Sequence, residues 1–241
     1  MSTQNADSAP EDSSGLLSIF HKIASERKTT KVLATDDLEV DQDRHVIERM
    51  IACAGWAPFH KVCSSEHRSD GVMSGIEPWR FHLVDSDVCR QLRSRVQTME
   101  GAGKIPAMLS AAKTLVMATW LPNPLQSQPP AGAVASYFDP TEGNVEHIAA
   151  AAAAVQSLLL AATAAGLPNY WSSGGVLRSH QVFSWLGIPS REQLLGAIFL
   201  FPQQLPHKPH AEVVFSKLRD QRSAQTSWSR WVSLEDADQT S

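Results

Sequence analysis

The chain has 241 residues, of which 43% are hydrophobic and 19% are charged, and its formal net charge at pH 7 is −4. This length is within the range of one large domain with a sizeable core, and the composition is ordinary for a globular protein. The slightly acidic charge provides no general positive field, so it argues against nucleic acid and against a membrane surface as the main partner.

Cysteine usage and the two ends of the chain bear on compartment and domain organisation. Cys53, Cys63 and Cys89 are an odd number of cysteines in a chain too long to need disulfide bonds, which favours a reducing compartment and hence a cytoplasmic location. Residues 1–15 are rich in Ser and Asp, lack the features of a secretory signal, and predict a disordered tail. We expect one domain over 16–218, followed by a C-terminal tail over 219–241.

The first half of the chain shows alternating helix and strand signals. Apolar residues recur at helical spacing in two early segments, whereas residues 63–76 lack periodicity and predict an exposed insertion. Ser86 is a good N-cap for a further helix. The expected elements are a helix over 16–26, a helix over 41–55, a strand over 80–84, a helix over 86–100 and a buried strand over 114–120.

The middle of the chain combines a proline-rich loop with a long alanine-rich helix. Residues 121–142 contain five prolines and predict a surface loop that covers a site. The helix is expected over 145–165, with Gly166 at its C-terminal end. Its uncharged stretch has the length of a membrane span, but it consists mostly of alanine, so we interpret it as a buried helix of a soluble protein.

The remaining segment predicts one short helix from Ser179 to Gly187, then a fully buried strand over 194–201 and extended or irregular chain after Pro202. Helices and strands that alternate in this way indicate an α/β or α+β fold, in which helices cover a compact sheet. No internal repeat is visible.

Four segments, in this order, resemble the FMN-dependent nitroreductase family: Arg27-Lys28-Thr29-Thr30-Lys31, Ala57-Pro58-Phe59-His60-Lys61, Pro78-Trp79-Arg80-Phe81, and Gly166 through Trp171-Ser172-Ser173-Gly174. The similarity is to short single-domain bacterial members and covers about residues 16–203. It implies an α+β, three-layer fold with a central, mostly antiparallel sheet flanked by helices. It also implies a homodimer formed through the long helix, with one FMN at each of two sites built from both chains.

The resemblance further implies how the cofactor is held. The FMN phosphate needs fixed cations or donors, and Arg27 and Thr29 match these positions. Lys31 matches a cation beside N1 and C2=O, where reduction adds negative charge, and Lys104 is a second candidate for this field. The cofactor-binding residues that the resemblance implies are Arg27, Lys28, Thr29, Lys31, Trp56, His60, Trp171, Ser172, Ser173, Gly174 and Lys208.

Some of these residues also have simpler interpretations. The Arg27–Lys31 cluster alone is typical of a solvated basic helix end, and Trp56 alone is typical of core packing. Three residues depart from the family pattern. Phe59 stands where Ser is frequent, Glu77 stands near a position where an amide bonds the flavin, and His210 replaces the Arg of a Lys-x-Arg phosphate element that begins at Lys208.

The implied function is an FMN-dependent oxidoreductase that takes hydride from NADH or NADPH and reduces a small-molecule electron acceptor, such as a nitroaromatic or a quinone, by a ping-pong mechanism. No catalytic side chain is expected, because flavin N5 carries the chemistry. One alternative is a flavin-binding protein or partner subunit without turnover, favoured by the three departures. Another is a structural zinc site formed by Cys53, His60, Cys63 and His67, all of which are zinc ligand types.

Overall fold

The computed structural model describes residues 13–41, 43–69, 73–126, 128–129, 132, 137–205 and 211–232. In chain order the elements are α1 (Ser13–Glu26), β1 (Thr30–Ala34), α2 (Arg44–Ala54), η1 (Ser65–Arg68), β2 (Trp79–Asp85), α3 (Ser86–Val96), α4 (Ile105–Ala111), β3 (Thr114–Trp120), α5 (Glu142–Ala164), β4 (Asn169–Ser172), η2 (Gly175–Arg178), α6 (His180–Leu186), β5 (Gln193–Leu200), β6 (Ala211–Phe215), η3 (Leu218–Gln221) and η4 (Gln225–Ser227).

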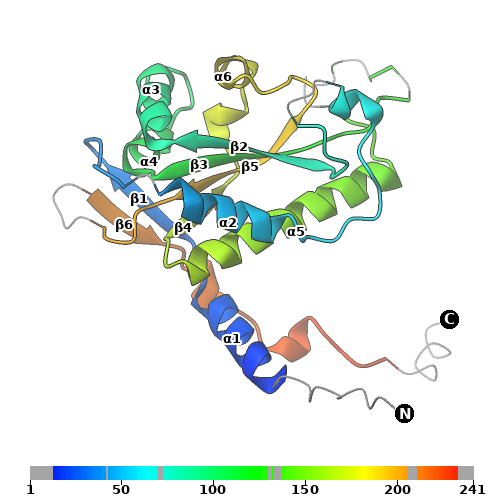
Figure 1. Cartoon of the computed structure of the whole chain (residues 1–241), viewed down its shortest axis with the longest axis horizontal. Helices are drawn as coiled ribbons and strands as arrows, with labels where there is room; N and C mark the ends of the chain where they lie inside the picture. Colours follow the sequence, from blue (N-terminus) through cyan, green and yellow to red (C-terminus); the bar gives the residue numbers. More distant parts are fainter. Residues whose placement is uncertain are drawn as a thin grey trace, which may run out of the picture.

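The expected three-layer α+β fold is confirmed. A four-stranded sheet has the order β2-β3-β5-β4, and every neighbouring pair is antiparallel. Helices α2 and α5 cover one face, and α3, α4 and α6 cover the other (Figure 1). Strands β1 and β6 form a separate antiparallel pair beside this sheet, and α1 projects away from the domain.

Two apolar cores lie on the two faces of the sheet. Met117 and Phe199 contribute to the core beneath α3, α4 and α6, whereas Val116 and Ile198 contribute to the core beneath α2 and α5. All seven residues of β3 are buried, which explains its continuous β-branched and apolar sequence. Successive residues of this central strand therefore serve opposite cores.

The long helix α5 packs on the sheet through small side chains. Ala154 and Ala162 are fully buried, and Leu158 lies between them. Among the described helices, α5 alone is long and apolar enough to cross a membrane by length and composition. Its buried face contacts α2 and the sheet, which is the environment of a core helix. Gly166, with a φ of 72°, ends the helix as the sequence predicts.

The insertion over 63–76 is built around a buried arginine. The Arg80 guanidinium, on β2, donates to the carbonyl oxygens of Gly75, Glu77 and Trp79 at 2.8, 2.8 and 2.7 Å. His67 is also buried, and its Nε2 lies 2.8 Å from the Pro122 carbonyl oxygen. The described part of the insertion is therefore anchored to the sheet and to the loop that follows β3, although most of its side chains are exposed.

Gly196 is a position at which the packing of the sheet permits no side chain. A Cβ there would lie 2.0 Å from Trp171 Nε1 and 2.9 Å from the Ser172 carbonyl oxygen. We predict that Gly196→Ala lowers the free energy of unfolding by about 1–3 kcal/mol through overpacking, measured by chemical denaturation. Gly143→Ala is the control, since a Cβ there meets only Asn123 Nδ2 at 3.2 Å. Equal stability of the two variants would contradict the prediction.

His67 predicts a pH dependence of stability. Burial lowers the pKa of its imidazole, and the charges of Arg191 and Arg80 act in the same direction. The resulting stabilisation is fully present above the unfolded pKa of about 6.5 and is lost as the pH falls through the lower folded value. On acidification from about pH 7.5 to about pH 5.5, the wild type should therefore lose more unfolding free energy than His67→Gln.

The glutamine amide can still donate to Pro122, so this variant separates titration from loss of the hydrogen bond. His45→Gln, at an exposed position of α2, is the matched control and should behave like the wild type. The same acid sensitivity in His67→Gln as in the wild type would show that another group is responsible.

Candidate functional site

Two of the four segments that carry the resemblance lie side by side. Thr29 forms a parallel bridge with Asn169, so the basic segment beside β1 adjoins the start of β4. The Lys31 ammonium lies 4.6 Å from the ring centroid of Tyr170, on β4. This arrangement brings Arg27, Lys28, Thr29 and Lys31 next to the strand that leads to the predicted Trp171–Gly174 turn.

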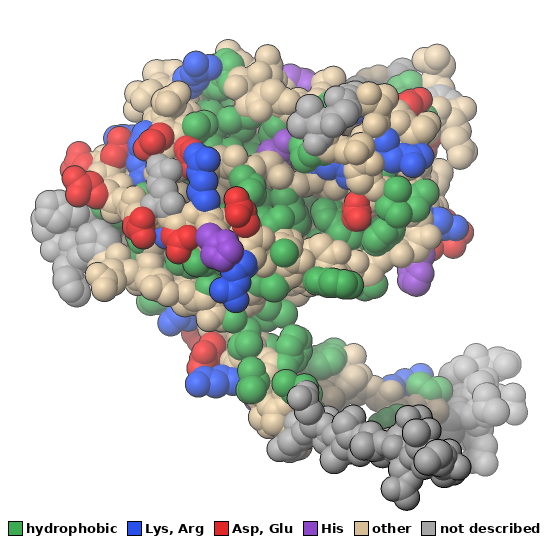
Figure 2. Space-filling model, viewed as in Figure 1, with side chains coloured by type: hydrophobic (Ala, Val, Ile, Leu, Met, Phe, Trp, Pro, Cys, Tyr) green, Lys and Arg blue, Asp and Glu red, His purple; other side chains and the backbone are tan. Residues whose placement is uncertain are grey.

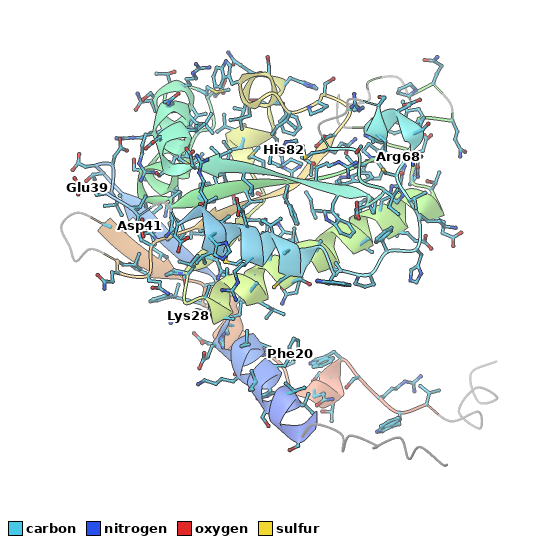
Figure 3. All side chains as sticks on the ribbon, in the orientation of Figure 1. Phe20, Lys28, Glu39, Asp41, Arg68 and His82 are labelled. Atoms are coloured by element: carbon cyan, nitrogen blue, oxygen red, sulfur yellow. The ribbon has the colours of Figure 1, made fainter. Side chains whose placement is uncertain are left out.

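The basic residues differ in exposure and contacts. Arg27 is half-buried, whereas the exposed Lys28 places its ammonium 4.4 Å from the ring centroid of Phe215, on β6. Figure 3 shows Lys28 where α1 meets the domain. The cluster directly follows the end of α1, as a basic helix end would, but it also contacts β4 through Thr29 and Lys31 and β6 through Lys28.

The turn after β4 depends on two glycines. Gly174 has a φ of 103° and Gly175 a φ of 51°, both in the region that favours glycine. A Cβ on Gly174 would lie 2.5 Å from Leu194 Cδ2. The buried Ser172 hydroxyl accepts a hydrogen bond from the Gly174 amide at 3.2 Å. Ser172 thus shapes the turn, which leaves the exposed Ser173 at its surface.

The start of α4 approaches the same turn. A Cβ on Gly175 would lie 3.9 Å from Ile105 Cγ1. Lys104, which directly precedes α4, is exposed. Lys104, the second candidate cation, therefore belongs to a segment that approaches the glycine turn.

Trp56 and His60 lie in a different part of the chain. The neighbouring Ala57 packs in a core with Ala150 and Ala154, in the first half of α5, whereas β4 follows the end of that helix. About 15 Å of helix separate Ala154 from Ala164. The Trp56 side chain is 91% exposed, so core packing does not account for it within one chain.

The departures from the family pattern have identifiable surroundings. The ring of Phe59 makes an edge contact with Trp79 at 5.5 Å between centroids. The Glu77 carboxylate lies close to Gly75, whose added Cβ would be 2.3 Å from Glu77 Oε2. Lys208 and His210 lie outside the described residues.

The zinc hypothesis is wrong for the part of the chain that the structure describes. Cys53 is exposed, Cys63 is buried with its Sγ 3.5 Å from the Gly75 carbonyl oxygen, and His67 faces Pro122. Across these ranges, no three His, Cys, Asp or Glu side chains form a group that could hold a metal ion.

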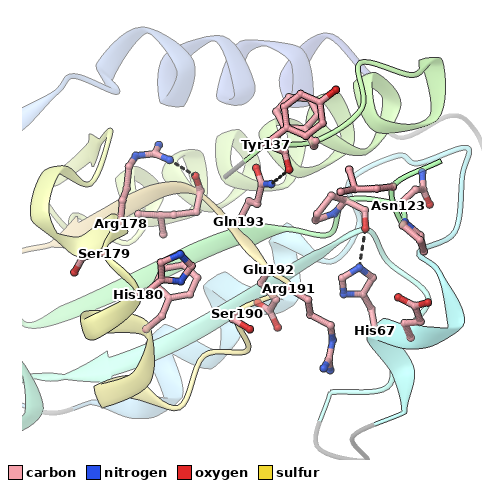
Figure 4. Close-up of a pocket in the computed structure, with 17 residues that line it drawn as sticks. His67, Asn123, Tyr137, Arg178, Ser179, His180, Ser190, Arg191, Glu192 and Gln193 are labelled. Atoms are coloured by element: carbon pink, nitrogen blue, oxygen red, sulfur yellow. Dashed lines mark hydrogen bonds between the residues drawn. The ribbon is translucent and has the colours of Figure 1, made fainter. Parts of the chain in front are cut away.

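A cavity of about 480 Å³ opens between α6, the insertion and the segment after β3 (Figure 4). Glu192 is buried beside it, and Glu192 Oε2 lies 2.7 Å from His82 Nε2 and accepts from the Thr119 hydroxyl at 2.5 Å. This cluster was not predicted from the sequence, because His82 lies on β2, Thr119 on β3 and Glu192 directly before β5, and only their polarity among apolar neighbours signals it. The described part of the proline-rich loop, including Tyr137, lines this cavity.

Solved structures of similar fold carry nitroreductase descriptions. A nitroreductase-like family protein from Bacillus cereus has a TM-score of 0.53 at 18% identity, over 93% of this chain and 98% of that chain. A nitroreductase family protein from Clostridium novyi NT has a TM-score of 0.50 at 15% identity, over 77% of this chain and 85% of that one. A nitroreductase with bound FMN from Bacteroides fragilis has a TM-score of 0.47 at 18% identity, over 78% and 92%. At these identities the likeness concerns the fold alone.

The sequence comparisons give the family directly. No curated protein matches the chain. The sequence profile of the nitroreductase family, however, matches residues 24–200, which include β1, the glycine turn after β4 and the whole central sheet. The chain therefore belongs to the nitroreductase family.

Proposed function

We propose that this protein is an FMN-dependent oxidoreductase that takes hydride from NADH or NADPH and reduces a small organic acceptor, such as a nitroaromatic or a quinone, by a ping-pong mechanism. One observation carries this proposal: Thr29, in the basic segment before β1, forms a bridge with Asn169, at the start of the strand that leads to the glycine turn. The chain that makes this contact belongs to the nitroreductase family. When bound, FMN supplies hydride acceptance and return at its N5 atom.

The residues around this contact fit a flavin phosphate and its ring. Arg27, Lys28 and Thr29 offer a guanidinium, an ammonium and a hydroxyl for the phosphate. The positive φ of Gly174 turns the backbone after β4 and leaves Ser173 exposed, so that the turn would offer its surface to a planar ring. Trp171 and Ser173 flank that surface.

Lys31 would tune the reaction. Its ammonium is held over Tyr170, beside β4, where the pyrimidine edge of the ring would lie. A cation about 4 Å from a developing negative charge contributes on the order of 4 kcal/mol at an effective dielectric of 20. Because that charge exists mainly in the reduced cofactor, Lys31 would favour hydride transfer to the flavin over its reversal.

We propose a homodimer in which each flavin site takes its Arg27 segment from one chain and its Trp56 and His60 from the other. The support is the position of these two groups at different parts of α5, together with the 91% exposure of Trp56. The projecting α1 carries exposed hydrophobic side chains (Figure 2). Leu17 is 68% exposed, and Phe20 is 56% exposed (Figure 3). Trp231, near the other end of the described chain, is fully exposed. Contact with a second copy would cover these apolar side chains.

We also propose a cytoplasmic location, supported by the odd number of cysteines, and no nucleic-acid or membrane partner, supported by the net charge of −4. The alternative of a flavin-binding protein without turnover is favoured by Phe59 and Glu77, which replace a hydroxyl and an amide with an aromatic ring and a carboxylate. The following experiment separates it from the enzyme.

An absorbance spectrum of the purified protein should show a flavin band between about 300 and 550 nm, and anaerobic NADH or NADPH should bleach it. The nucleotide that bleaches the band identifies the electron donor. A band that neither nucleotide changes, with no oxidation of either in the presence of acceptors, would favour the inactive binder. No band after addition of FMN would contradict the proposed function.

Mixed dimers test the sharing of sites. Arg27→Gln and the double variant Trp56→Ala, His60→Ala should each bind FMN weakly. When the two are mixed and exchange subunits, about a quarter of all sites become intact, because each mixed dimer contains one unchanged site. FMN binding and NAD(P)H oxidation should therefore reappear. Self-mixtures of each variant are the controls, and no recovery in proven mixed dimers would place both groups in one chain's own site.

A further inference from the structure

The chain after β6 folds back onto the basic segment. The Ser216 amide donates to the Thr29 carbonyl oxygen at 3.2 Å, and the Arg219 guanidinium donates through Nη1 to the carbonyl oxygen of Arg27. Arg219 belongs to η3 and is half-buried. The stretch that the sequence assigns to a tail therefore begins inside the candidate site, beyond residue 200, where the family match ends.

The contact of the Arg219 guanidinium with the Arg27 backbone brings two arginines together at this point of the described chain. Throughout the described ranges, the carboxylates that pair with Lys, Arg or His lie elsewhere, on Asp37, Asp85 and Glu192. Burial lowers the pKa of the Arg27 guanidinium, and the charge of Arg219 lowers it further. Like charges on neighbouring residues favour a bound anion, since an anion offsets their repulsion and gains charge-assisted hydrogen bonds.

The contact with the Arg27 carbonyl uses one of the five N–H donors of Arg219 and fixes its position. The remaining donors include a planar edge suited to two oxygens of one phosphate. Lys217 and Arg222 flank Arg219 in sequence but are exposed. Among these three cations, Arg219 is the one that is half-buried and hydrogen-bonded to Arg27.

We propose that Arg219 is a second guanidinium of the phosphate site, which joins Arg27 on the FMN phosphate and supplies the charge that His210 does not. The inference rests on the proposed function, because it assumes that the bound flavin is the phosphorylated form. It assigns Arg219 a specificity role: this residue favours FMN over riboflavin, which carries the same ring without the phosphate. Arg219 touches the anion and takes no part in hydride transfer.

The test compares FMN and riboflavin binding to the flavin-free full chain by fluorescence quenching. Arg219→Gln should weaken FMN binding about tenfold or more, since a hydrogen bond to a charged group is lost, and should leave riboflavin affinity within about twofold. Arg219→Lys keeps the positive charge but lacks the planar pair of N–H donors, so its FMN affinity should lie between those of the wild type and Arg219→Gln. This variant replaces Arg219→Gln in the test if Arg219→Gln fails to fold. Arg222→Gln removes the same charge three residues away and should match the wild type.

Three results would overturn the inference. Equal FMN affinities for Arg219→Gln and Arg222→Gln would show that Arg219 does not reach the phosphate. An equal loss of FMN and riboflavin binding in Arg219→Gln would assign the residue to folding of the site. The third result is a wild-type protein that binds neither flavin. This result would overturn the proposed function as well, whereas the first two concern Arg219 alone.

Discussion

Close packing of α5 against a buried sheet is the constraint on which the other features depend. Alanines such as Ala154 and Ala162 let the helix backbone approach the strands, and the absence of charge makes this approach favourable. The helix then fixes two distant points of the chain. Its first half holds Ala57, and its end, through the left-handed Gly166, directs β4 beside β1. Both parts of the candidate site therefore take their positions from one helix.

Local sequence patterns predict the helices and strands of the core, but they do not predict all of the segments that form the candidate site. The long helix and the strands β3 and β5 were predicted because they are continuous apolar runs with clear ends. By contrast, no strand was predicted at β1, since its pairing with β6 joins Thr30 to Phe215 and leaves no periodic pattern in five residues. Helix α4 is absent from the predicted elements because it is short and contains Pro106, although proline is favoured in the first turn of a helix.

The residues of the site were likewise predictable to different degrees. The resemblance indicated Arg27, Lys31 and the Trp171–Gly174 turn, and the structure brings these segments together. It gave no reason to expect that Ser172 would bond within the turn, because that depends on the positive φ of Gly174. Arg219 carries no sequence signal, since its side chain bonds to the Arg27 carbonyl oxygen, 192 residues away in the chain. Long-range contacts of this kind arise only once β1 and β6 are paired.

The departures from the family pattern are unevenly distributed, and this bears on the proposed function. Phe59 and Glu77 both belong to the part of the chain near Trp56, where Phe59 packs on Trp79 and Glu77 lies over Gly75. The basic segment of Arg27, Lys28 and Lys31, which we propose binds the phosphate, keeps its cations. If the two parts meet across a dimer, anchoring of the cofactor and the environment of its reactive ring are controlled by separate chains. Substitutions in the Trp56 part can then change which acceptor is reduced without loosening the phosphate, because they touch none of its ligands.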